Sequence, residues 1–410
     1  MNSAKYWVWL SMVFGTGSHR IWDVMHFFEF AGHAYEEIVS GYLSSRLDEN
    51  EMRNANHIKL DDAQKHIDYC KQRGIGIVTY GESEYPSQLR NIYNPPTVLY
   101  YKGNLSCLKN KASVVSVGTR RASAYGIRAA KEICHELAEK GALIISGFAV
   151  GIDIASSLAA SDINRPSVCV MGCGLDIDYP KENFRFRSQI INSGGVFISE
   201  YPPGTSPYPY NFPKRNRILA GLGRTAIVFE ASIKSGSLIT AGMAMDQGKE
   251  VFCLPPADIF SRSFSGNVSL LRDGAVPLYS ADDIIDHFSK INELNVFSDS
   301  DTYTVLNNIR RSVKNMGVFR EISASGTKRK PKPKSDEIAE AEKENAFENK
   351  VEDLSPIQQK IIGILSDGAM HADVIAQKLE IDQSELNYQL TELELFGILK
   401  SLPGKMFEIN

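Results

Sequence analysis

Short apolar runs alternate with amphipathic segments through the middle of the chain. The runs are rich in Val, Ile and Ala and break at Gly, Ser or Pro, as strands do, whereas the segments between them have helical spacing. Near-continuous apolar strands that alternate with helices predict an α/β fold, with a parallel sheet covered on both faces. The strands are expected at 76–79, 98–101, 113–117, 142–146, 167–171, 196–199, 225–230, 250–254 and 276–279. The helices expected between them include 123–140, 182–192, 214–221, 237–247 and 269–273.

The segments on either side of this region have different patterns. Residues 1–70 predict short helices. Residues 323–352 hold a basic block, Lys328–Lys334, followed by an acidic run, and because neither can bury a core we expect a disordered linker. Near the end of the chain, Ser355 and Gln358 fit a capping box, and three helical segments precede a hairpin. Three helices and a hairpin are typical of a winged helix.

Composition narrows the class of protein. The chain has 410 residues and a net charge of −4, with 43% hydrophobic and 23% charged residues, which is usual for a globular protein. The apolar run Tyr6–Phe14 is far shorter than the roughly 20 residues of a spanning helix, so neither a membrane segment nor a secretory signal is expected. Six cysteines without a CxxC pair predict a reducing, cytoplasmic setting, with no disulfide framework and no zinc site.

Two loops at predicted strand ends have the composition of anion-binding turns. The loop Gly118–Ser123 contains Arg120 and Arg121, and Ser123 is a natural N-cap for the helix that follows. A glycine turn that enters a helix presents free N–H groups to an anion. The segment Lys234–Thr240 is a second helix entry, made of small residues, hydroxyls and a lysine. Both loops therefore suit phosphate, although paired arginines within a folded core remain an alternative.

The segment 200–217 combines aromatic rings with cations. Tyr208, Tyr210 and Phe212 come just before Lys214, Arg215, Asn216 and Arg217, and prolines extend the loop between them. Flat rings beside cations at a helix start suit single-stranded nucleic acid, because bases stack on the rings and phosphates pair with the cations. Aromatic loops are also often simply packed, so this alternative stays open.

The strand-end loops lack the residues of common catalytic sites. The eight histidines avoid these loops, so no Ser-His-Asp or Cys-His set can be assembled from them. No cluster has metal-ligand spacing. Asp153 is expected to cap its helix rather than to catalyse. The loops predict phosphate binding without a catalytic residue, metal or cofactor.

Taken together and in order, these motifs resemble those of the DNA-processing protein A family (DprA/Smf). The segments that carry the resemblance are Val117–Arg120, Ser146–Asp153, Ser199–Gly204, Phe212–Ile218 and Lys234–Ala241. It covers most of 75–288 and is specific, whereas the flanking segments fit the family more loosely.

The resemblance implies an extended Rossmann-like, doubly wound, mostly parallel sheet. It divides the chain into a small helical (SAM-like) domain at 1–70, the sheet domain at 71–298, a linker at 299–352 and a winged helix at 353–410. It implies a homodimer that is not an enzyme, binds single-stranded DNA without sequence preference and loads RecA recombinase during natural transformation. The DNA contacts it implies are Gly118, Thr119, Arg120, Arg121, Ser123, Gly147, Lys181, Phe212, Lys214, Arg215, Asn216, Arg217, Gly236, Ser237 and Thr240.

The chain departs from the family pattern at two places. Val150 and Ser156-Ser157 stand where the family often has an arginine and a histidine, and Pro255-Pro256 replaces a proline-glycine turn.

Two other functions compete with the leading one. A Rossmann-like nucleotide phosphoribohydrolase would need a PGG turn and a glutamate that 234–240 lacks, and a transcription regulator would need cations in 383–394, which has none.

Overall fold

The computed structural model describes residues 3–109, 112–294 and, with gaps at 367, 380, 396–397 and 403–405, residues 355–409. The chain divides into two compact units, Met1–Ser289 and Lys290–Asn410. The expected linker 299–352, with the basic block Lys328–Lys334, lies outside the described residues.

Nine strands form one sheet within the described part of the first unit, in the order β1-β2-β6-β5-β4-β3-β7-β8-β9. All neighbours from β6 to β9 in this order run parallel, whereas β2 is antiparallel to both β1 and β6. The strands are β1 (Gly76–Thr79), β2 (Val98–Gly103), β3 (Ser113–Val117), β4 (Leu143–Ser146), β5 (Ser167–Met171), β6 (Val196–Ser199), β7 (Thr225–Val228), β8 (Val251–Cys253) and β9 (Val276–Pro277). Each lies where the apolar pattern predicts it, and the doubly wound, mostly parallel fold is confirmed.

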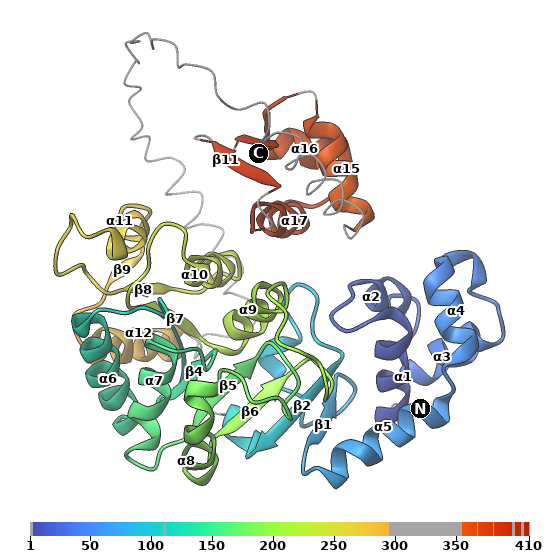
Figure 1. Ribbon diagram of the computed structural model, residues 1–410, viewed down its shortest axis with the longest axis horizontal. Coiled ribbons are helices and arrows are strands. Elements are labelled where there is room, and N and C mark those ends of the chain that lie inside the picture. The colour runs from blue at the N-terminus through green and yellow to red at the C-terminus, as the bar shows by residue number, and fades with distance from the viewer. Residues whose placement is uncertain are drawn as a thin grey trace, which may run out of the picture. The chain divides into compact units, whose positions relative to one another are not determined.

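Helices cover both faces of this sheet (Figure 1). On one face, α9 (Asn211–Leu222) and α10 (Gly236–Asp246) share a core with Val115, Val170 and Ile198. On the other, α6 (Ala124–Glu139), α7 (Ile152–Ser161) and α12 (Ala281–Leu294) pack on Val114, Ile144 and Ile227. Each fully buried Val or Ile contributes about 1.5–3 kcal/mol. Alternate residues of one strand thus face the two helical layers.

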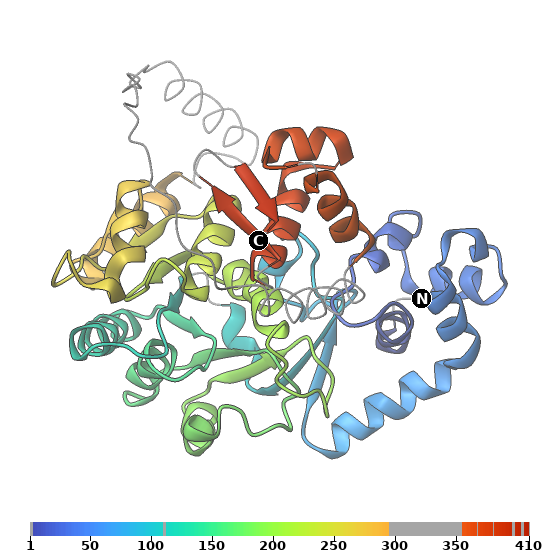
Figure 2. The ribbon, with the colours of Figure 1, turned by 45° about the horizontal axis from the view of Figure 1, so that its top comes forward.

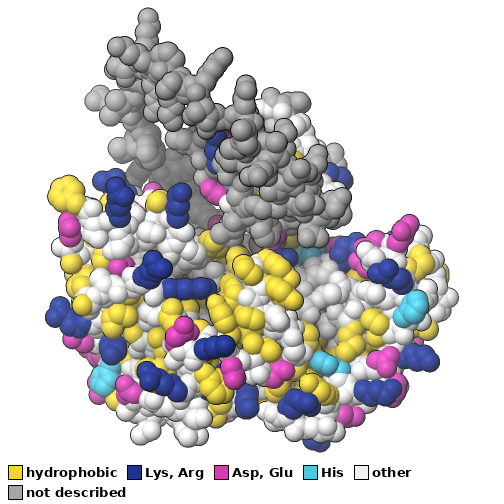
Figure 3. Space-filling model, viewed as in Figure 1, with side chains coloured by type: hydrophobic (Ala, Val, Ile, Leu, Met, Phe, Trp, Pro, Cys, Tyr) yellow, Lys and Arg dark blue, Asp and Glu magenta, His cyan; other side chains and the backbone are white. Residues whose placement is uncertain are grey.

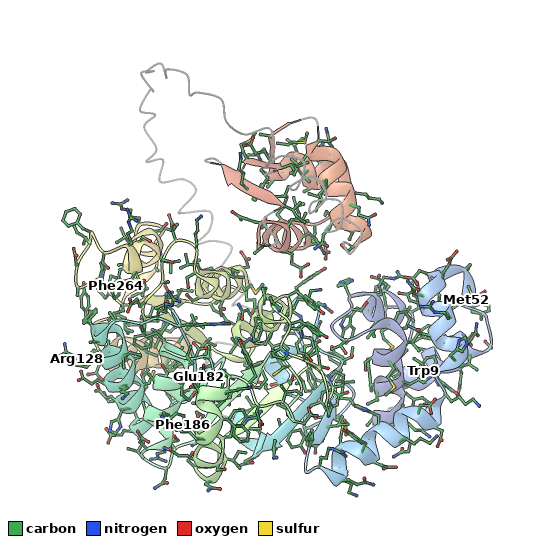
Figure 4. The ribbon with its side chains drawn as sticks, in the orientation of Figure 1. Trp9, Met52, Arg128, Glu182, Phe186 and Phe264 are labelled. Carbon is green, nitrogen blue, oxygen red and sulfur yellow. The ribbon has the colours of Figure 1, made fainter. Side chains whose placement is uncertain are left out.

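The helices of the sheet differ from the sequence prediction in three respects. The expected helix 182–192 is a 3-10 turn η4 (Lys181–Phe186), which contains Glu182 and Phe186 labelled in Figure 4, followed by α8 (Arg187–Asn192). The helices α9 and α11 (Ser265–Arg272) both begin before their expected starts. The helix α12 was not expected, and α7 was expected only as the helix that Asp153 would cap. The sequence of α7 shows no helical period, because its Ala and Ser residues are buried on several sides and leave no polar face.

The N-terminal helices belong to the same unit as the sheet. They are α1 (Ala4–Phe14), α2 (Arg20–Met25), α3 (Ala31–Val39), α4 (Glu49–His57) and α5 (Leu60–Gln72). Figure 2 shows them at the end of the sheet beyond β1. Trp9, labelled in Figure 4, is fully buried among them and donates its indole N–H to Ile58 O at 2.7 Å. Trp22 Nε1 donates to Pro95 O at 2.9 Å, so polar contacts as well as the shared apolar core join these helices to the sheet.

The second unit has a winged-helix arrangement. Its elements are α15 (Pro356–Leu365), β10 (Met370–His371), α16 (Ala372–Leu379), α17 (Gln383–Leu395), β11 (Leu399–Leu402) and β12 (Met406–Ile409). Ser355 caps the N–H of Gln358 while the Gln358 side chain accepts from Ser355 N–H, which confirms the capping box. The strands pair in the order β10-β12-β11, and the short β10 was not expected.

One buried amide holds the ends of β7 and β8 against α11. Asn267 is fully buried, and its Oδ1 accepts from Ala231 N at 2.8 Å. Its Nδ2 donates to Leu254 O at 2.9 Å and to Phe229 O at 3.1 Å. The loops after both strands therefore depend on one side chain that is both donor and acceptor.

We predict that Asn267→Asp lowers the thermal stability of the sheet unit. A carboxylate cannot donate to the two carbonyl oxygens, and a buried group left without partners costs about 1–3 kcal/mol or more when it is charged. Thermal unfolding of the variant beside Asn104→Asp, a change at an exposed site, measures this effect. Equal melting temperatures for the two variants would contradict the role given to Asn267.

Candidate nucleic-acid interface

The parallel strands bring several loops to one edge of the sheet. Because β3, β4, β5, β6 and β7 run in the same direction, the loops after them meet at their carboxyl ends. Along the sheet, β4, β5 and β6 lie on one side of β3 and β7 on the other, so the strand order reverses beside β3. Ligands of open α/β sheets bind outside the carboxyl ends at such a reversal.

The ring of Phe212 lies at the centre of this edge. Its centroid is 5.6 Å from the guanidinium carbon of Arg120, 5.9 Å from that of Arg215 and 5.4 Å from the Tyr179 ring. A Cβ at Gly172 would lie 2.9 Å from the Phe212 ring, so glycine is needed there for the ring to approach the end of β5. The half-buried ring thus lies among two cations and a second aromatic ring.

Arg215 is a buried structural group rather than a surface cation. Its guanidinium donates to Gly147 O at 3.1 Å and to Val170 O, which joins the ends of β4 and β5. Only 6% of its surface is exposed, and burial lowers its pKa. The expected contact between Arg215 and DNA phosphate is therefore corrected: this arginine satisfies main-chain carbonyl groups.

The Asp153 carboxylate lies near this guanidinium, on the same side of Gly147. Its Oδ2 accepts from the N–H groups of Gly147 at 3.1 Å and Ala149 at 3.4 Å, in the turn before α7. The expected helix cap at Asp153 is therefore corrected, because Gly151 is the N-cap of α7 and no side chain caps this helix. Burial raises the pKa of Asp153 to about 6, although Arg215 and the two N–H groups favour the charged form. A Cβ at Gly147 would lie 2.6 Å from a guanidinium nitrogen and 2.7 Å from Oδ2. Gly147 thus serves close packing, not direct DNA contact.

Arg217 and Asn216 also point into the protein. Arg217 pairs with Glu200 at 2.5 Å, and each residue is about 5% exposed. Asn216 accepts from Arg215 Nε at 3.2 Å and donates to Gly236 O at 3.4 Å. Every residue of α9 from Arg215 to Leu222 is buried. The expected DNA contacts of Arg217 and Asn216 are corrected for this reason.

A carboxylate of the protein occupies the anion-binding start of α6. Glu230 Oε2 accepts from the N–H and hydroxyl groups of Ser123 at 2.8 and 2.7 Å, and Thr119 N donates to Glu230 O at 2.7 Å. Glu230 is fully buried, and the Ser123 hydroxyl also caps Gly126 N. Ser123 was expected to contact DNA, but its donors are already used. Gly118 is tightly packed too, since a Cβ there would lie 2.5 Å from Ile152.

The start of α10 is only partly open. Ser235, not an anion, caps the helix through Ser237 N, and the two hydroxyls are 2.6 Å apart. Ser237 and Thr240 are 8% and 1% exposed. Their expected place on a phosphate surface is corrected, whereas Gly236 is exposed.

Four of the expected cations remain accessible. Arg120, Arg121 and Lys181 are exposed and Lys214 is half-buried. On the face drawn in Figure 3, lysine and arginine side chains lie among hydrophobic ones over this unit. Tyr179 was not among the expected site residues, although its place in a strand-end loop was a usable signal. Among the described residues, no group of three His, Cys, Asp or Glu could hold a metal ion.

Known protein families match two segments of this chain. Residues 76–289 match the family described as DNA recombination-mediator protein A, and residues 346–405 match the DprA winged helix domain. The DNA processing protein DprA of Streptococcus pneumoniae is 39% identical over 232 residues, which span 57% of this chain and 80% of that protein. Protein Smf of Synechocystis is 27% identical over 416 residues and 99% of both chains.

A solved structure shares the fold. The X-ray structure of the Streptococcus pneumoniae protein superposes with a TM-score of 0.61 at 32% identity, and the match covers 70% of this chain and 98% of that one. In the part of the chain that the structure describes, no helix is long and apolar enough to cross a membrane.

We predict that Asp153 makes stability fall as pH rises from about 4 to about 6. In this window the folded protein keeps the proton, because its pKa is about 6, while the unfolded chain, with a pKa near 3.8, loses it. A difference of about 2 pKa units corresponds to about 3 kcal/mol, present at pH 4 and lost by pH 7. Thermal unfolding of the wild type and Asp153→Asn between pH 4 and 7 measures it. The wild type should lose stability relative to the variant as pH rises.

The matched control for this measurement is Asp68→Asn, which changes an exposed carboxylate on α5. Its melting temperature should follow that of the wild type across the range. A constant offset between the wild type and Asp153→Asn would show that Asp153 does not titrate in this window.

Proposed function

The chain belongs to the DNA recombination-mediator protein A family, and on this premise we propose that it binds single-stranded DNA at the carboxyl edge of its sheet. The observation that carries the proposal is the half-buried Phe212 ring, with the exposed cation Arg120 against it and Lys214 in the same helical turn. The ring offers a surface to an unpaired base, and the cations pair with the phosphates beside it.

Single strands suit this arrangement better than a duplex. A duplex stacks its bases against one another, so a ring at the protein surface cannot reach their faces. The accessible cations around the Phe212 ring contact phosphate groups. Because phosphates are the same in every base sequence, these contacts give no sequence preference. The proposed contacts are Phe212 for stacking and Arg120, Arg121, Lys181 and Lys214 for phosphate, with Gly236 and Thr119 near the same edge.

The buried arginines contribute indirectly. Arg215 ties α9 to the ends of β4 and β5, and Arg217 ties it to Glu200 after β6. These bonds fix the first turn of α9, where Phe212 and Lys214 lie. A preformed site loses less conformational freedom on binding than a mobile one.

We propose that, in the cell, the protein binds single-stranded DNA during the recombination of incoming DNA. The matching family is described as a recombination mediator, which supports delivery of RecA recombinase onto the bound strand during natural transformation. We include a homodimer and a cytoplasmic location in the proposal. The six cysteines are free, which fits a reducing compartment.

The acidic residues at the carboxyl edge of the sheet also agree with a binding role without catalysis. Asp153, Glu200 and Glu230 are 6% exposed or less, and each already holds main-chain N–H groups, a guanidinium or a serine. A phosphoribohydrolase-type enzyme, the alternative, would need a carboxylate that reaches its substrate. Release of base or phosphate from nucleotides by the purified protein would favour this alternative.

We predict that Arg120→Glu and Lys214→Glu each weaken binding of oligo-dT by at least about tenfold. Each change removes a phosphate contact and adds repulsion, and it should lower the slope of log affinity against log salt by about 0.7–1. Fluorescence anisotropy with labelled oligo-dT and a matched duplex, at several salt concentrations, measures both effects. The wild type should prefer the single strand.

Arg165→Glu is the control for the cation variants, because Arg165 is exposed in the loop before β5, at the opposite edge of the sheet. It should bind as the wild type does. Unchanged affinity in a folded Arg120→Glu, Lys214→Glu double variant would place the DNA elsewhere, and equal affinity for the duplex would exclude stacking.

We predict that deletion of 353–410 leaves oligo-dT binding within about threefold of the full chain. The deleted winged helix has acidic residues on α17, and its Lys400 pairs with Glu408 at 2.7 Å, so it offers little to phosphate. Anisotropy on the truncated chain, with its fold checked by circular dichroism, measures the effect. Loss of binding in a folded truncated chain of unchanged oligomeric state would move the site to the winged helix.

A further inference from the structure

Two tyrosine rings lie parallel at the protein surface just before α9. The centroids of Tyr208 and Tyr210 are 5.3 Å apart and the ring planes differ by 5°. The side chains remain 48% and 46% exposed. In the described residues, the other pairs of Tyr, Phe and Trp rings are tilted or edge-on. The pair therefore presents flat aromatic surface to solvent, which a packed aromatic cluster does not.

The backbone below the two rings is well ordered by internal bonds. Tyr208 N donates to Ser206 O at 2.9 Å, and Asn211 N donates to Tyr208 O at 3.0 Å. Asn211 is 3% exposed, and its carbonyl accepts from the Tyr201 hydroxyl at 3.2 Å. Pro209 fixes its own φ between the rings. A ligand that stacks on the tyrosines would thus find their main chain already in place.

The rings lie next to the candidate DNA site along the chain and in space. Phe212 N donates to Pro209 O at 3.4 Å, so one tight turn separates the tyrosine pair from the Phe212 ring. Lys214 follows in the same first turn of α9. The order along this segment is two rings, a third ring and a cation. A strand of DNA with successive bases on one side and phosphates on the other matches this order.

We propose that Tyr208 and Tyr210 form a second nucleobase platform, which extends the single-stranded DNA site beyond Phe212. This inference rests on the proposed function and adds a subsite for unpaired bases. The rings stack on a base face, which every base has, so the platform adds affinity without sequence preference. The hydroxyls keep the pair solvated when DNA is absent, because tyrosine joins an apolar face to a polar edge.

The test compares oligo-dT with an abasic deoxyribose-phosphate oligomer of the same length. Tyr208→Ala and Tyr210→Ala, singly and together, should weaken oligo-dT binding. The expected loss is about 5-fold to 150-fold for each base that no longer stacks, which is the stacking range of about 1–3 kcal/mol converted at 1.4 kcal/mol per tenfold. Binding of the abasic oligomer should not change, because it has no base to stack. Tyr208→Phe and Tyr210→Phe keep the ring and should bind oligo-dT nearly as the wild type does.

Tyr42→Ala is the matched control, because Tyr42 is 79% exposed in the N-terminal helical region. A wild type that fails to bind oligo-dT would overturn the proposed function itself. A wild type that binds, with alanine variants that bind oligo-dT equally well, would overturn only the platform. Equal losses for oligo-dT and the abasic oligomer in folded alanine variants would also overturn it, since the tyrosines would then act on loop shape alone.

Discussion

The buried guanidinium of Arg215 is the contact on which the candidate interface depends. It reaches from α9 to the carbonyl groups of Gly147 and Val170, so one side chain joins a helix to the ends of two strands. The Phe212 ring lies against the same guanidinium, and the Asp153 carboxylate lies near it beside Gly147. Loss of one partner of a buried charged group costs about 3–5 kcal/mol, so this junction also restricts which residues can occupy 147 and 153.

The cations of this edge consequently fall into two groups with different physical roles. Arg215 and Arg217 are buried and satisfy internal oxygens, while Arg120 and Lys214 retain contact with water. Only the second group can release counterions when a nucleic-acid chain binds, which makes it the source of salt dependence. The first group instead determines where the second group and the aromatic rings lie.

Much of the fold could be predicted from the sequence, but the division of the cations could not. Strands such as Ser113–Val117 are recognisable because a parallel strand buried on both faces is apolar throughout. The partner of Arg217 is 17 residues away along the chain, and that of Ser123 is 107 residues away. The sequence does not distinguish a cation that faces solvent from one that pairs with a buried carboxylate. Only the packing of β6 beside β5 and of β7 beside β3 brings Glu200 to Arg217 and Glu230 to Ser123.

The position of Glu230 favours an extended ligand at the proposed site. In Rossmann-like folds the N-terminus of the first helix after a strand commonly holds a phosphate through its free N–H groups. Here the start of α6 already holds the Glu230 carboxylate, on the N–H and hydroxyl of Ser123, beneath the surface. A single nucleotide would have to displace a buried charge to enter. A strand that lies across Arg120, Phe212 and Lys214 would displace only water, so the proposed site suits a polymer better than a single nucleotide.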